Sequence, residues 1–166
     1  MRFKSLLLGA AFVSVSAVSA QEVGTRAPAF DVAGSGAKNV RLADLKGRVV
    51  YVDFWASWCA PCKQSFPWMN EMQEKYGARG LSVVAVTVDR KREDADKFLA
   101  TTPARFTVAY DTTGKVAEAF RPKGMPTSFL IGADGVVRSV HVGFKDSDKA
   151  DLEREIQAAL AAAGRK

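Results

Sequence analysis

Two cysteines separated by two residues, Cys59 and Cys62, are the side chains of this sequence best suited to chemistry. They are its only cysteines, and a bridge across so short a loop constrains the unfolded chain very little, so it would be a poor structural staple. Zinc also binds cysteines at this spacing, but it needs about four ligands and His141 is the only histidine. The pair therefore predicts a reversible dithiol/disulfide centre, with no metal and no other cofactor.

The segments around the cysteines place them between a strand and a helix. Residues 49–55 are nearly all apolar or β-branched, which is typical of a strand buried on both faces. Residues 62–76 have apolar side chains at helical spacing, and Pro61 suits the first turn because its missing N–H costs nothing there. Cys59 thus lies at a helix N-terminus, where free N–H groups and the helix dipole favour the thiolate. In such motifs the thiol pKa falls from about 8.5 to between about 3.5 and 7.5.

The rest of the chain alternates between strand and helix patterns, which predicts an α/β fold with parallel strand pairs. A hairpin is expected about Ala133-Asp134-Gly135. Further strands are expected at 81–89, 106–110, 128–131 and 136–142, and further helices at 92–101, 116–120 and 147–163.

The first residues have the pattern of an export signal. Two basic residues precede an apolar run at 6–15, and small residues follow at 18–20. This pattern predicts a signal peptide over residues 1–20 and a mature domain over 21–166 in an oxidising, periplasmic compartment. An uncleaved membrane anchor is the competing interpretation, although a span needs about 20 apolar residues and this run is shorter.

The run VDFWASWCAPCK, residues 52–63, resembles the active-site strand, loop and helix of thioredoxin. The wider chain, with its Met125-Pro126-Thr127 segment, resembles the exported thioredoxin-like thiol:disulfide oxidoreductases of the TlpA type. This resemblance implies a thioredoxin-like α/β fold, in which a central mixed β-sheet is flanked by helices on both faces. It also implies that Pro126 follows a cis peptide bond beside the cysteines.

The same resemblance implies catalytic roles for three residues. Cys59 would attack a substrate disulfide, and Cys62 would resolve the mixed disulfide that results. Asp53 interrupts an apolar strand, where a desolvated carboxylate costs free energy unless it has a task, and it would accept or relay the proton of Cys62. An exposed aspartate at a strand end is the alternative. TlpA-type proteins often carry a Glu at the position of Ser65, and its absence here makes Asp53 the better candidate.

Substrate contacts are expected from five residues that flank the cysteines in space. Trp58 would shield Cys59 and touch partners, whereas Trp55 and Trp68 are interpreted as packing residues. The Met125 backbone would pair with an extended substrate segment. The expected substrate-binding residues are Trp58, Ala60, Pro61, Met125 and Pro126.

These features predict an enzyme that exchanges its dithiol with protein thiols and disulfides. Family analogy favours a reductant, recharged by a membrane electron donor and serving proteins such as apocytochromes c. A monomer is expected by default, because the sequence shows no obvious dimerisation segment. Basic residues are scattered along the sequence, so no nucleic-acid partner is expected, although the net charge is +6. The alternatives are a copper-binding metallochaperone that uses the cysteines and His141, and a thiol peroxidase, which would need a Thr that does not precede Cys59 here.

Overall fold

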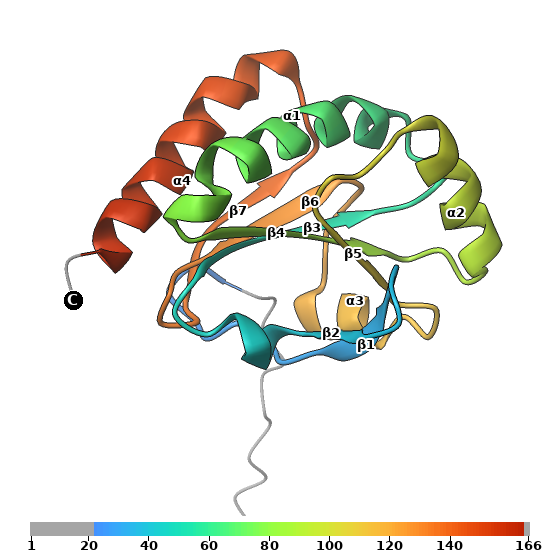
Figure 1. Cartoon of the computed structure of the whole chain (residues 1–166), viewed down its shortest axis with the longest axis horizontal. Coiled ribbons are helices and arrows are strands. Elements are labelled where there is room, and N and C mark those ends of the chain that lie inside the picture. The colour runs from blue at the N-terminus through green and yellow to red at the C-terminus, as the bar shows by residue number, and fades with distance from the viewer. Residues whose placement is uncertain (1–21, 165–166) are drawn as a thin grey trace, which may run out of the picture.

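The computed structural model describes residues 22–164, and its centre is a seven-stranded sheet in the order β2-β1-β5-β4-β3-β6-β7 (Figure 1). Strands β3, β4 and β5 are parallel, and every other neighbouring pair is antiparallel. The strands are β1 (Asp31–Gly34), β2 (Asn39–Arg41), β3 (Val49–Trp55), β4 (Leu81–Thr87), β5 (Thr107–Tyr110), β6 (Thr127–Ile131) and β7 (Val137–Val142).

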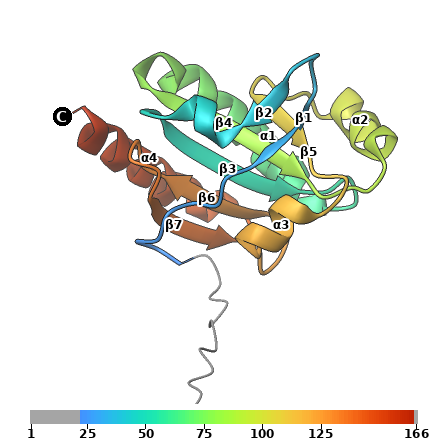
Figure 2. The same ribbon diagram turned by 90° about the horizontal axis from the view of Figure 1, so that it is seen from below.

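Helices cover both faces of this sheet. The α-helices are α1 (Ala60–Tyr76), α2 (Arg92–Thr101), α3 (Lys115–Phe120) and α4 (Lys149–Ala163). Helices α1, α2 and α4 lie on one face of the sheet (Figure 1). Helix α3 lies on the other face, near β1 and β2 (Figures 1 and 2). The thioredoxin-like α/β fold expected from the sequence is confirmed.

Most of the expected elements lie within one or two residues of their predicted bounds. Helix α1 starts at Ala60, ahead of the expected 62, because Cys59 is extended and serves as its N-cap. Helix α4 begins at Lys149 because the preceding residues form a 3-10 turn, Asp146–Asp148. The β6–β7 hairpin turns where predicted, with Gly135 at a positive φ of 79°. The signal peptide predicted over residues 1–20 lies outside the described residues.

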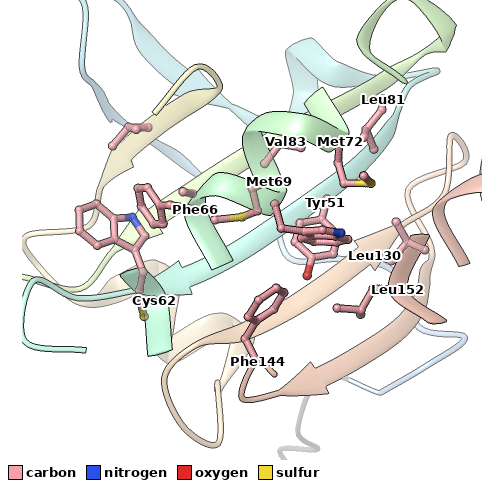
Figure 3. Close-up of a cluster of buried hydrophobic side chains, with 14 of the residues drawn as sticks. Tyr51, Cys62, Phe66, Met69, Met72, Leu81, Val83, Leu130, Phe144 and Leu152 are labelled. Atoms are coloured by element: carbon pink, nitrogen blue, oxygen red, sulfur yellow. The ribbon is translucent and has the colours of Figure 1, made fainter. Parts of the chain in front are cut away.

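The central strand β3 divides the core into two clusters. All seven of its residues are buried, as the continuous apolar run predicted. Val50, Val52 and Phe54 join the cluster beneath α3. Tyr51 and Trp55 face the other way, into the cluster that contains α1, α4 and both cysteines. Figure 3 shows Tyr51 in the middle of this second cluster and Cys62 toward one end of it. Successive side chains of a strand point to opposite faces of the sheet, so alternate residues of β3 belong to the two different clusters.

Candidate active site

The two cysteines form a disulfide at the N-terminus of α1. Their Cα atoms are 5.4 Å apart, and the Cys59 N–H donates to the carbonyl of Ala56 at 3.0 Å. Cys62 lies one turn into the helix and is fully buried, whereas Cys59 is 4% exposed. Trp58 is 72% exposed beside them, as predicted for a surface aromatic. Cys59 is therefore the more exposed of the two cysteines, at the positive end of a 17-residue helix.

A buried carboxylate holds the loop that leads into the cysteines. Asp89 follows β4 and accepts hydrogen bonds from the Ser57 N–H at 2.8 Å and from the Ser57 hydroxyl at 2.9 Å. The Thr87 hydroxyl also donates to Asp89, at 2.8 Å. Because β3 and β4 are parallel neighbours, their C-terminal ends meet, and Asp89 can hold the loop that follows β3. This contact fixes the approach of the chain to Cys59.

The Met125–Pro126 peptide bond is cis, as the resemblance to thioredoxin implied. Thr127 pairs with Phe54 in the β3–β6 ladder, so Pro126 lies at the same end of the sheet as the cysteine loop. The Pro126 carbonyl accepts a hydrogen bond from the Gly143 N–H at 2.7 Å, which ties this segment to the end of β7. Met125 is half-buried and packs against the cluster that contains both cysteines.

Asp53 is buried inside β3 and shares the face of Tyr51 and Trp55. It is 2% exposed, so the alternative of an exposed aspartate at a strand end is wrong. Among the described residues, its Oδ2 atom has no hydrogen-bond partner. Burial raises the pKa of Asp53 well above its ordinary value of 3.8. The carboxyl group is therefore held in its neutral form over an unusually wide pH range.

A row of polar groups extends across the sheet from Asp53 toward solvent. Ser128 on β6 pairs with Asp53, and His141 on β7 pairs with Ser128, so all three side chains point to the same face. The Nε2 atom of His141 lies 2.8 Å from Glu155 of α4 at the half-exposed end of the row. Tyr51 lies two residues before Asp53 on the same face of β3. Burial raises the pKa of Tyr51, and the nearby charge of an ionised Asp53 raises it further.

The structure brings the predicted site residues to one end of the sheet. Asp53 lies two residues before the end of β3, further inside the sheet than the others. The cysteine loop supplies Trp58, Ala60 and Pro61, which are all exposed around the disulfide. Ser65 is buried, and its hydroxyl donates to the Cys62 carbonyl at 3.1 Å. Sequence reasoning missed Asp89; the available signal was an acidic residue at the end of the strand predicted over residues 81–89.

Within residues 22–164, no cluster of three or more His, Cys, Asp or Glu side chains is arranged to hold a metal ion. Within the same range, no helix has the length and apolar character to cross a membrane.

Comparison with known proteins gives consistent matches along the chain. The Redoxin family model matches residues 22–156. The thiol-disulfide oxidoreductase ResA of Bacillus cereus is 35% identical over 136 residues, which cover 82% of this chain and 78% of that protein. ResA of Bacillus subtilis is 35% identical over 120 residues, covering 72% of this chain and 67% of that protein.

Solved structures agree with the sequence matches. A crystal structure from Chlorobium tepidum, assigned as the thiol:disulfide interchange protein DsbE, superposes with a TM-score of 0.83 at 55% identity, covering 85% of this chain and 99% of that one. A second thiol:disulfide interchange protein of the thioredoxin family, from Chlorobium tepidum TLS, gives a TM-score of 0.72 at 32% identity, with coverage of 85% and 99%. The chain belongs to the Redoxin family, among the thioredoxin-fold thiol:disulfide oxidoreductases of the TlpA and ResA type.

Proposed function

We propose that this protein is exported to the periplasm and reduces disulfides of other proteins with its Cys59–Cys62 dithiol. The observation that carries the proposal is the placement of the pair: Cys59, the more exposed of the two, is the N-cap residue of α1, and Cys62 is buried one turn further along. A helix N-terminus favours the thiolate, and only the thiolate attacks a disulfide.

The reaction consists of two thiol–disulfide exchanges. The Cys59 thiolate attacks one sulfur of the substrate disulfide, so that a mixed disulfide forms and one substrate thiolate leaves. Cys62, as a thiolate, then attacks the Cys59 sulfur, which releases the second substrate thiolate and closes the intramolecular disulfide. Two electrons pass to the substrate, and its two thiolates take up protons.

Asp53 is the proposed acceptor of the Cys62 proton. It shares the face of the sheet against which Cys62 packs, and its Oδ2 atom has no partner among the described residues. Because burial raises the pKa of Asp53, its ionised form is a stronger base than an exposed aspartate, and only this form accepts the Cys62 proton. It would deprotonate Cys62 when the mixed disulfide is to be resolved.

The proposed substrate contacts surround the disulfide. The exposed Trp58 ring offers an apolar surface beside Cys59, with Ala60 and Pro61 next to it. The Met125 backbone, before Pro126, would pair with an extended segment of the substrate, as in recognition by strand addition.

The direction of electron flow follows from the resemblance to TlpA-type proteins and is part of the proposal. Each turnover leaves the pair oxidised, and the periplasm is an oxidising compartment, so a membrane electron donor must reduce it again. Apocytochromes c are suitable substrates, since their Cys-x-x-Cys-His motif must be reduced before haem attachment. We propose that the protein acts as a monomer after removal of residues 1–20.

The decisive experiment equilibrates the mature protein with glutathione buffers and measures the two redox forms by thiol trapping and mass. A reductant should have a potential nearer to about −270 mV than to about −120 mV, the range spanned by thioredoxin and strong oxidants. A value near the upper limit would make the protein an oxidant and contradict the proposal. The mass of the N-terminal peptide from a periplasmic extract tests cleavage after Ala20.

A further inference from the structure

Four segments distant in the sequence meet around the disulfide, and we define them together as the collar. Residues 57–64 carry the cysteines, and 88–92 contact them through the bonds from Ser57 to Asp89. Residues 121–127 include Pro126, and 142–146 are tied to it by the bond from the Gly143 N–H. A protein that offers a disulfide to Cys59 would approach it beside these segments.

The collar has a net positive charge, whereas the rest of the folded domain has a net negative one. It contains seven Lys and Arg against two Asp, a net charge of +5. The remaining described residues contain 13 Lys and Arg against 16 Asp and Glu, a net charge of −3. Basic residues that are scattered in the sequence are thus concentrated around the disulfide by the fold.

The two acidic residues of the collar do not neutralise its cations. Asp89 is buried and accepts hydrogen bonds from Ser57 and Thr87, and Asp146 pairs with Lys149 outside the collar. Five collar cations are exposed and make no ion pair with any residue in the range 22–164: Lys63, Arg90, Lys91, Lys123 and Lys145. They come from all four segments, so positive charge surrounds the cysteines.

We propose that the collar is a docking surface for a partner protein whose redox-active cysteines lie in an acidic segment, rich in Asp and Glu. This inference rests on the proposed function and specifies the chemistry of its partner. Charges arranged in this way attract a complementary surface before contact, and they raise association rates by tenfold or more at low salt. A partner protein with a basic surface around its cysteines is repelled by the same positive charge. The collar would therefore select among proteins that carry disulfides.

The test compares three disulfide-bonded peptides with one Cys-x-x-Cys sequence and flanks of Glu, Gln or Lys. Thiol trapping gives the second-order rate at which the reduced protein reduces each peptide. At about 20 mM salt, the Glu peptide should react at least about tenfold faster than the Lys peptide. At about 500 mM salt the ratio should fall below about two, because the Debye length shrinks to a few ångströms.

Variants assign the effect to the collar. The triple variant R90Q/K123Q/K145Q, which leaves the residues next to the cysteines unchanged, should lose most of the preference for the Glu peptide. The control variant K38Q/K46Q/R79Q removes three exposed cations outside the collar and should retain it.

The outcomes separate this inference from the proposed function. Equal rates for the three peptides at low salt, or a faster reaction with the Lys peptide, would overturn the acidic-partner proposal while reductase activity stands. A preference that survives in R90Q/K123Q/K145Q would also overturn it, because the selection would then arise elsewhere. Failure to reduce even the Gln peptide would instead contradict the proposed function itself.

Discussion

Replacement of Asp53 by Asn should change how the stability of the protein depends on pH. Burial raises the pKa of Asp53 well above its ordinary value of 3.8, so the folded protein keeps a proton that the unfolded chain has released. In that window the unfolded state binds fewer protons than the folded state, and the free energy of unfolding falls as pH rises. The stability contributed by this group is complete below the ordinary pKa and is lost toward the raised one.

The size of the effect follows from a difference of one bound proton between the folded and the unfolded state. The free energy of unfolding loses up to about 1.4 kcal/mol for each pH unit within the window, and the Asp53→Asn variant avoids this loss because an amide does not titrate. Between pH 5 and pH 7 the variant should therefore gain up to about 2.7 kcal/mol relative to the native protein. For a domain of this size, such a gain corresponds to a Tm difference of up to about 5–11 °C.

Guanidinium chloride unfolding of the oxidised proteins at pH 5, 6, 7 and 8 measures this difference. The exposed Glu118 provides a matched control, because Glu118→Gln removes one carboxylate from the surface. We expect the curve of free energy against pH to flatten for Asp53→Asn and to keep its native slope for Glu118→Gln. Parallel curves for the native protein and Asp53→Asn would refute the argument that the buried carboxyl group stays protonated.

Three further substitutions test the site and its support. Cys62→Ser should accumulate a mixed disulfide between Cys59 and substrate, seen as a mass adduct that dithiothreitol removes; absence of the adduct would contradict the order of attack. Asp89→Ala leaves the Ser57 N–H without its acceptor and should lower the free energy of unfolding by at least about 2 kcal/mol in guanidinium chloride; native stability would show that this contact is dispensable. Phe66→Ala removes a ring that packs against three other aromatic rings and should cost about 3–5 kcal/mol in the same assay, with Phe66→Leu as the milder control; equal losses would argue against specific ring packing.

The sequence alone determined the local features of this protein. The run 49–55 is a strand because all of its side chains except that of Asp53 are β-branched or aromatic and suit a buried sheet, and α1 follows from apolar residues at helical spacing. The redox pair was identified from its spacing and its place before a helix. These properties depend on neighbours within a few residues, so the sequence displays them directly.

The position of Pro126 beside the cysteines could be predicted only through resemblance to a known family. An X-Pro bond is cis in only about one case in twenty, and no local pattern here separates this bond from a trans bond. The 63 residues between Cys62 and Pro126 give no measure of their distance in space. Pairing of β6 with β3 decides it, because this pairing brings Thr127 next to Phe54.

Tertiary structure also decided the electrostatics of the site. Asp53 is the one acidic residue in the apolar run 49–55, and only the cover of α1 and the neighbouring strands makes it a buried carboxyl group with a raised pKa. Asp89 acquires its role because parallel β3 and β4 end at the same edge of the sheet. The collar cations are far apart along the chain, and they act together because electrostatic interaction depends on distance in space, which the strand order sets.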